Sequence, residues 1–258
     1  MENIQKFKEI IKNNEVDHIK FLMINEFLNI KKIDKNLIQK TTLLKNLKVK
    51  FQNKSIKDKP FFNIKNLEDL EKNFEDILTF NEKRLEGAIY TPHYIINSIL
   101  KKSFDYTKLN NNSVFLDPAC GSGAFLINII KTLLNKKLKF EFIVKNMIYG
   151  LDINDQAIFN SKILIELFSL ELNTPISSNI LNIYKFDFIS NNENFILKKL
   201  GLKKRIDFIC SNPPYIKLQN IDDKIRNDLK KRYSSYFKGS FSTSLCFIIP
   251  SRSQTGPN

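Results

Sequence analysis

The sequence predicts an α/β fold in which a parallel, doubly wound, Rossmann-like sheet of about four strands follows a helical N-terminal region. Over residues 1–85, apolar side chains recur near helical spacing with Lys, Asn and Glu between them. From residue 87 onward, short apolar runs alternate with helical stretches, a pattern typical of a parallel sheet covered by helices. We therefore expect two parts, a helical region over residues 1–85 and an α/β domain over residues 86–258.

The individual elements follow from the same periodicities. Apolar runs predict strands over residues 114–117, 147–152, 183–188 and 206–211. Helical patterns predict helices over residues 67–85, 92–103, 124–136, 155–172 and 221–237. Within the N-terminal region, the segment NKSIKDKP at residues 53–60 interrupts the helical pattern. Residues 1–90 contain no E-x-K or D-x-K end of a metal-dependent nuclease site, so we interpret the region as a packing or interaction module.

Composition excludes several classes of protein. The 258 residues are 42% hydrophobic, which is enough for a large core and argues against a disordered or fibrous chain. No apolar run reaches the roughly 18 residues that a membrane span needs, and the N-terminus has no hydrophobic signal segment. Three widely spaced cysteines fit neither a disulfide scaffold nor a CxxC zinc site. We expect a soluble cytoplasmic protein with reduced thiols and no bound metal.

The net charge of +14 suits a polyanionic partner such as nucleic acid. Only five of the 41 cations are Arg, however, and Lys lacks the planar fork that recognises phosphate with two hydrogen bonds. Charge alone leaves nucleic-acid binding and a well-solvated surface equally open. The same alternatives hold for the basic segment at residues 221–238.

The first motif is VFLDPACGSGAFL at residues 114–126, a strand that enters a glycine turn and leaves as a helix. Gly121 and Gly123 allow a sharp bend, and Asp117 ends the strand at the edge where open α/β sheets bind ligands. Alone, such a turn is equally an ordinary strand-to-helix connection. It also resembles the start of a dinucleotide fingerprint, but Leu126 occupies the position of the third glycine.

Acidic residues are predicted at the ends of the next two strands. Asp152 follows Asp117 by 35 residues, and its two oxygens can accept hydrogen bonds from a ribose diol. Asp187 follows after a further 35 residues, where it can accept from an adenine amino group beside an apolar wall formed by Phe188. Taken singly, either carboxylate is more often a solvated residue or a cap at the end of a strand.

The fourth predicted strand ends in Asn212, Pro213, Pro214 and Tyr215. Two prolines fix the backbone and remove two donors, so the Asn212 side-chain oxygen and the Pro213 carbonyl form a rigid pair of acceptors. Such a pair can bind both protons of an exocyclic amine and favour attack by its nitrogen. Tyr215 offers a flat surface for stacking a planar substrate such as an extruded base.

With these motifs in this order, the chain resembles the S-adenosylmethionine-dependent N6-adenine DNA methyltransferases of type I and type IIG restriction and modification systems. The residues that carry the resemblance are GAIYTP at 87–92, DPACGSGAFL at 117–126, Asp152, Asp187 and NPPY at 212–215. The resemblance covers roughly residues 86–240. It also implies a partner, double-stranded DNA from which an adenine is flipped.

The resemblance assigns roles to individual residues. The methionine end of the cofactor would be held by the residues around the Y-T-P element and the glycine turn: Tyr90, Thr91, Asp117, Gly121 and Gly123. Asp152 would bind the ribose, and Asp187 with Phe188 the adenine ring. The target base would be held by Asn212, Pro213 and Tyr215. Cys120 and Cys210 are expected to be buried structural thiols rather than nucleophiles, because no His lies near either in the sequence.

After residue 239 the sequence departs from the family. The segment SFSTSLCFIIPSRSQTGPN has no Lys and no acidic residue, whereas the family continues through further strands into a recognition region. We expect a chain that is truncated or frame-shifted near residues 239–241, with the fourth strand left as an unpaired apolar edge and weak or no activity alone. Target recognition would then require a specificity subunit or a missing C-terminal region.

Other functions remain open at this point. NPPY also occurs in enzymes that methylate RNA bases or the glutamine of release factors, although the DPACGSG and Y-T-P elements favour DNA. A nicotinamide dehydrogenase would need the complete glycine fingerprint and would not explain NPPY. The chain could also be a remnant that binds the cofactor without transferring its methyl group.

Overall fold

The computed structural model describes residues 15–54, 62–81, 91–103, 109–191, 193–203, 206–215, 221–233, 244, 246 and 247. The helices of the N-terminal region are α2 (Val16–Ile30), α3 (Leu43–Phe51) and α4 (Leu67–Asn81), with a 3-10 turn η1 (Leu37–Lys40). The α/β part contains the helices α5 (His93–Ser103), α6 (Ala124–Leu134), α7 (Phe140–Asn146), α8 (Asp155–Glu171), α9 (Glu193–Leu200) and α10 (Asp223–Tyr233), with a 3-10 turn η2 (Ser178–Ile180). None of the helices described is long and apolar enough to cross a membrane.

The expected parallel sheet is confirmed. Its strands are β1 (Phe115–Asp117), β2 (Ile148–Asp152), β3 (Asn182–Lys185) and β4 (Phe208–Ile209), in the order β3-β2-β1-β4. Leu116 at the centre of β1 lies opposite Tyr149 of β2 and Ile209 of β4. Among the described residues, β4 pairs only with β1, so it forms one edge of the sheet.

The third strand is shorter than predicted. We expected it to run through residue 188, but it ends at Lys185. The Phe186 amide still donates to the Asp152 carbonyl at 2.8 Å, after which the chain turns and Asp187 Oδ1 accepts from the Ser190 amide at 3.2 Å. Asp187 therefore caps a turn beyond the strand instead of ending the strand itself.

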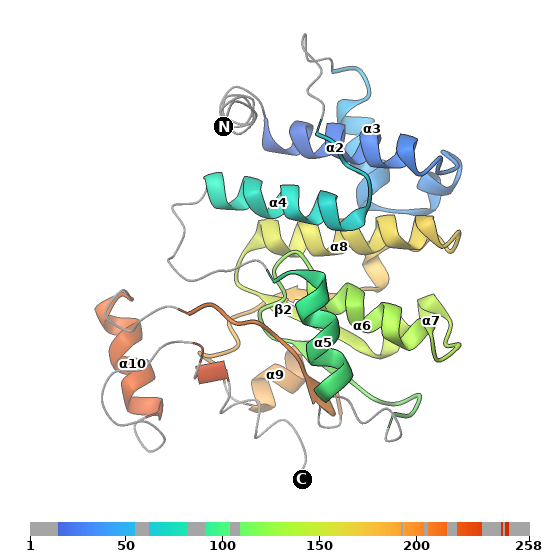
Figure 1. Cartoon of the computed structure of the whole chain (residues 1–258). Helices are drawn as coiled ribbons and strands as arrows, with labels where there is room; N and C mark the ends of the chain where they lie inside the picture. The colour runs from blue at the N-terminus through green and yellow to red at the C-terminus, as the bar shows by residue number, and fades with distance from the viewer. Residues whose placement is uncertain are drawn as a thin grey trace.

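Side chains alternate across the sheet and build a core on each face. Phe115, Ile148 and Ile183 face the helices α5 to α8, whereas Leu116 and Tyr149 face the side that α9 covers. Figure 1 shows α2, α3 and α4 on the far side of α8 from the sheet, so that α8 is enclosed between two layers. That position explains why α8 is buried along nearly its whole length.

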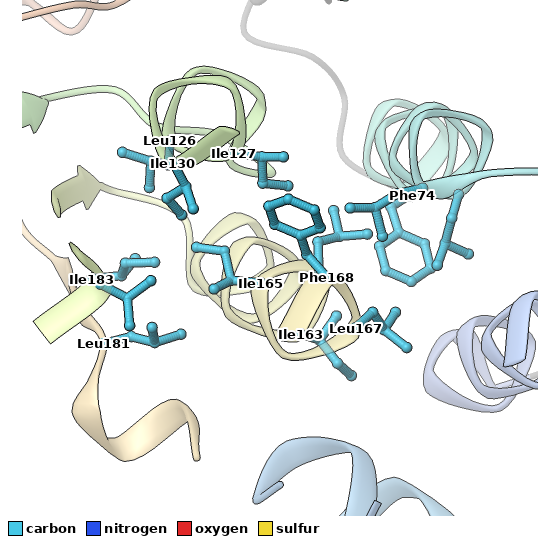
Figure 2. Close-up of a cluster of buried hydrophobic side chains, with 14 of the residues drawn as sticks. Phe74, Leu126, Ile127, Ile130, Ile163, Ile165, Leu167, Phe168, Leu181 and Ile183 are labelled. Carbon is cyan, nitrogen blue, oxygen red and sulfur yellow. The ribbon is translucent and has the colours of Figure 1, made fainter. Parts of the chain in front are cut away.

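The N-terminal helices share a continuous hydrophobic core with the α/β part. Figure 2 shows Phe74 of α4 next to side chains of α8, with Phe168 of α8 reaching toward Ile127 of α6. The expected helical character of this region is confirmed for α2, α3 and α4. Residues 55–61 and 82–90, which include most of the expected interruption, lie outside the described residues.

A buried carboxylate fastens this N-terminal layer to α8. Glu166 is fully buried, and its two oxygens accept hydrogen bonds from the backbone amides at the start of α3 and from the Ser178 amide of η2. The distances are 2.9 Å from Thr42, 3.2 Å from Leu43, 3.0 Å from Leu44 and 2.8 Å from Ser178. A charged acceptor at the N-terminus of α3 satisfies amides that the helix itself leaves without partners.

We expect Glu166→Gln to lower the free energy of unfolding by about 3 kcal/mol, because its amide nitrogen would face backbone donors. Denaturant titration followed by circular dichroism measures this change. The matched control is Glu171→Gln, which removes a partly exposed ion pair with Lys31 at the end of the same helix. That control should cost less than about 1 kcal/mol. Equal costs for the two variants would contradict the anchoring role of Glu166.

Candidate functional site

The sheet order makes the neighbouring ends of β1 and β4 the place where a ligand crevice is expected. From β1 the chain builds β2 and β3 on one side and then returns to place β4 on the other side. Loops that leave neighbouring strands in opposite directions open a crevice at the carboxyl edge, where α/β proteins bind ligands. The glycine turn follows β1, and the NPPY segment follows β4. The Cys210 amide donates to the Leu116 carbonyl at 3.0 Å. The glycine turn and the NPPY segment therefore leave the sheet next to each other.

The glycine turn requires glycine at two positions. Gly121 and Gly123 have φ values of 52° and 94°, in the left-handed region, and Gly123 is the N-cap residue of α6. A Cβ atom on Gly123 would lie 2.7 Å from the Ser161 hydroxyl of α8. The turn therefore packs directly against α8. Its conformation depends both on the positive φ values of the two glycines and on this close contact.

We expect Gly123→Ala to lower the free energy of unfolding by at least about 2 kcal/mol, because strain and a collision add together. Gly201→Ala is the control, since Gly201 also has a positive φ of 66° but open space around it. That variant should cost about 1 kcal/mol from the backbone alone. Thermal or denaturant unfolding of both proteins tests the difference, and equal losses would show that the contact with Ser161 is unimportant.

Asp117 ends β1 as predicted and lies beneath the turn, with 1% of its surface exposed. Its Oδ1 accepts from the Ala119 amide at 3.1 Å. Burial raises the pKa of this carboxyl from 3.8 to about 7, and the charge of Asp152 acts in the same direction. The Ser211 side chain lies close enough to lower the pKa, although its hydroxyl does not meet the geometry of a hydrogen bond.

The raised pKa of Asp117 makes stability depend on pH. Because the folded protein holds this proton more tightly than the unfolded chain, the associated stability is fully present below about pH 4. It is lost as the pH rises through about 7. We expect Asp117→Asn to flatten this part of the curve of unfolding free energy against pH. A variant whose stability falls between pH 4 and 8 as steeply as that of the wild type would contradict the assignment.

Asp152 ends β2 as predicted and is bonded to the glycine turn. Its Oδ2 accepts from the Gly121 amide at 2.9 Å, and its Oδ1 accepts from the Asn154 amide at 2.9 Å. These two bonds fix the orientation of the carboxylate beside the turn. The structure thus brings Asp117, Gly121 and Asp152 together at one edge of the sheet.

The residues proposed for an adenine ring differ in their surroundings. The Asp187 side chain is exposed in its turn. Phe188 is 2% exposed and stacks on Phe247, with 5.7 Å between ring centroids. Its ring belongs to the hydrophobic core on the α9 side of the sheet. The roles of both residues toward a ligand stay predictions.

The NPPY segment meets the T-P element that precedes α5. Asn212 Nδ2 donates to Thr91 Oγ1 at 2.8 Å, although the two residues are 121 positions apart in the chain. This bond fixes the plane of the Asn212 amide and therefore the direction of its oxygen. Tyr215 follows with 52% of its surface exposed. Pro213 lies between them, and Tyr90 lies outside the described residues.

A family model described as N-6 DNA Methylase matches residues 65–257. The chain belongs to the N-6 DNA Methylase family. The resemblance inferred from the Y-T-P, DPACGSG and NPPY motifs is confirmed at the level of the family. The match begins at residue 65, within the N-terminal helical region, so α4 is part of the family domain.

Two curated relatives of this chain are named as type II methyltransferases, one of them also as a restriction enzyme. The chain is 27% identical over 177 residues to the type II restriction enzyme and methyltransferase RM.BcgI of Heyndrickxia coagulans. This match covers 67% of the chain and 25% of RM.BcgI. The chain is 32% identical over 152 residues to the type II methyltransferase M.VspI of Vibrio sp. (strain 343). This match covers 58% of the chain and 31% of M.VspI. The chain thus spans less than a third of the length of either relative.

Solved structures support the fold. The chain matches DrdV in its complex with DNA with a TM-score of 0.57 and 17% identity, over 74% of this chain and 22% of that one. It matches the type IIG restriction endonuclease BpuSI with a TM-score of 0.54 and 16% identity, over 93% of this chain and 29% of that one. At these identities the comparison establishes the shared fold alone.

The cysteines of the chain are buried, as expected for Cys120 and Cys210. Cys120, Cys210 and Cys246 are free thiols with at most 8% of their surface exposed. Burial raises the pKa of Cys120 well above its ordinary value and that of Cys210 to about 12. Within the part of the chain that the structure describes, no cluster of three or more His, Cys, Asp or Glu side chains could hold a metal ion.

Sequence reasoning missed three residues around the crevice. The Ser211 hydroxyl is enclosed and has no hydrogen-bond partner among the described residues. Its position directly before Asn212 was the available signal. Ser122 and Glu75 contact each other at the glycine turn, with 3.1 Å between the Ser122 amide and Glu75 Oε1. Glu75 carries no signal in the sequence, because it lies on a helix that looks like a packing element.

Proposed function

We propose that this chain transfers a methyl group from S-adenosylmethionine to the N6 atom of adenine in double-stranded DNA, as part of a restriction and modification system. The observation that supports this most directly is the hydrogen bond from Asn212 to Thr91. It brings the acceptor loop of NPPY to the T-P element beside the glycine turn. Of the solved structures with this fold, BpuSI is a type IIG restriction endonuclease and DrdV is in a complex with DNA.

The residues around the crevice fit the proposed cofactor. Asp152 lies at the end of β2, where a carboxylate can accept hydrogen bonds from a ribose diol, and it is bonded to the Gly121 amide of the glycine turn. The enclosed Ser211 hydroxyl and the buried Asp117 carboxyl are polar groups that a ligand with its own donors can satisfy. When bound, the cofactor supplies an electrophilic methyl group on a sulfonium. A dehydrogenase is disfavoured because its fingerprint is incomplete at Leu126.

The proposed roles of the NPPY residues in the reaction follow from the oxygen atoms that they offer as hydrogen-bond acceptors. Asn212 Oδ1 and the Pro213 carbonyl would each accept one proton of the adenine amino group. Holding both protons reduces delocalisation of the nitrogen lone pair into the ring. A nitrogen held in this way would be able to bond to the methyl carbon as the carbon–sulfur bond breaks, with one N6 proton lost to solvent. Tyr215, already exposed, would stack on the flipped base.

Double-stranded DNA is the partner that best suits the net charge of +14. Reading of a target sequence is expected to come from a specificity subunit or a further recognition region, because the residues proposed here bind the cofactor and the target base. A protein that modifies the DNA of its own cell would act in the cytoplasm.

We expect Asn212→Ala to reduce methyl transfer at least 100-fold. Transfer of tritium from labelled cofactor to mixed duplex DNA, with N6-methyladenine identified by mass spectrometry, measures this loss. Asn146→Ala is the matched control. Its side chain also donates one hydrogen bond, to the Phe142 carbonyl at 2.9 Å, but it lies just before β2 at the opposite edge of the sheet.

The control should transfer methyl groups as the wild type does. Equal transfer by the Asn212 variant and the wild type would defeat the role of Asn212. Methylation of RNA or of a release-factor peptide in place of DNA would overturn the proposed substrate.

A further inference from the structure

A carboxylate from the N-terminal helical layer reaches the glycine turn. Glu75 lies on α4, and its Oε1 accepts from the Ser122 amide at 3.1 Å. The same oxygen lies 3.6 Å from the point that a Cβ atom on Gly121 would occupy. Glu75 therefore contacts the turn on the side that the absence of a Gly121 side chain leaves accessible.

The same serine is held from a second direction. Asn160 of α8 lies with its Nδ2 atom 3.5 Å from the Ser122 hydroxyl, and Asn160 Oδ1 accepts from Lys20 Nζ at 2.7 Å. Lys20, on α2, is fully buried and also donates to Gln156 Oε1 at 2.8 Å. Burial lowers the pKa of Lys20 to about 8, while the charges of Asp17 and Glu75 act in the opposite direction.

Burying the Lys20 ammonium group against the neutral amides of Gln156 and Asn160 costs free energy. Its burial here therefore indicates a specific structural role. Lys20 contributes to a network that runs from α2 through Asn160 to the turn. Glu75 places a negative charge near the Lys20 ammonium group. Two elements of the N-terminal layer, α2 and α4, thus reach Ser122 from different sides.

One turn earlier on α4, a second carboxylate holds His93, the residue that follows the T-P element. Glu71 is 1% exposed and lies 2.7 Å from His93 Nε2, at the first residue of α5. The other ring nitrogen of His93 lies 2.8 Å from Asn128 Nδ2 of α6. Since residues four apart share one face of a helix, the same face of α4 positions both segments predicted to bind the methionine end.

We propose that Glu75 is a positioning residue for the methionine end of the cofactor, acting by holding the Ser122 amide and with it the glycine turn. This inference rests on the proposed function and extends it to the N-terminal layer. The adenosine end would lie against Asp152, which is bonded to the neighbouring Gly121 amide and not to the Ser122 amide that Glu75 holds. The effect of Glu75 is therefore confined to ligands that carry the amino-acid portion.

Two ligands separate this role from a general effect on folding. S-adenosylhomocysteine carries the amino-acid portion, whereas 5′-methylthioadenosine has the same adenosine and sulfur without it. Calorimetric titration of the full chain with each ligand gives both affinities. We expect Glu75→Ala to weaken binding of S-adenosylhomocysteine roughly tenfold, as for loss of one hydrogen bond to a charged group, and to leave 5′-methylthioadenosine unchanged.

Glu75→Gln keeps an oxygen that can accept from Ser122, so it should bind S-adenosylhomocysteine within about threefold of the wild type. Glu26→Ala is the control for the N-terminal layer. It removes acceptors for the Phe62 and Ile64 amides without touching the turn, and it should alter neither affinity.

The possible outcomes distinguish failure of the inference about Glu75 from failure of the proposed function. Equal binding of S-adenosylhomocysteine by Glu75→Ala and the wild type overturns the inference, as does an equal loss for both ligands. A glutamine variant as weak as the alanine variant also overturns it, because the hydrogen bond would not explain the effect. Failure of the wild type to bind S-adenosylhomocysteine defeats the proposed function itself.

Discussion

The position of β1 between two parallel neighbours determines the rest of this molecule. Because β2 and β4 both run parallel to β1, the loops that follow all three strands leave from the same edge of the sheet. That constraint gathers Asp117, Asp152 and Asn212 from a span of nearly a hundred residues without any long loop. It also explains why β1 needs only three residues, since its two backbone edges are both paired. The chemistry of the crevice is therefore a consequence of strand direction.

The sequence predicted what depends on local pattern. Asp117 and Asp152 were placed at the ends of strands because apolar runs of strand length stop at these carboxylates. Asp187 was placed wrongly relative to its strand, since β3 stops two residues earlier when the chain turns toward Ser190. The helices α7 and α9 were not expected, because each has only seven or eight residues and a correspondingly weak periodic signal.

Contacts between distant segments were beyond sequence reasoning. The bond between Asn212 and Thr91 joins two motifs that the resemblance had already named, so it strengthens an existing expectation. The contact between Glu75 and Ser122 had no such precursor, because a carboxylate on an amphipathic helix looks like any solvated residue. Only the enclosure of α8 between the sheet and the N-terminal helices brings α4 to the turn. The N-terminal layer thus contributes to the site through packing that periodicity alone does not reveal.

The three buried thiols give the crevice an unexpected chemical robustness. Cys120 lies within the turn and Cys210 lies two residues before Asn212, yet both side chains are buried. Oxidants attack the thiolate, and raised pKa values keep both groups protonated at neutral pH. The two cysteines next to the predicted site are in this way insulated from the redox state of their surroundings.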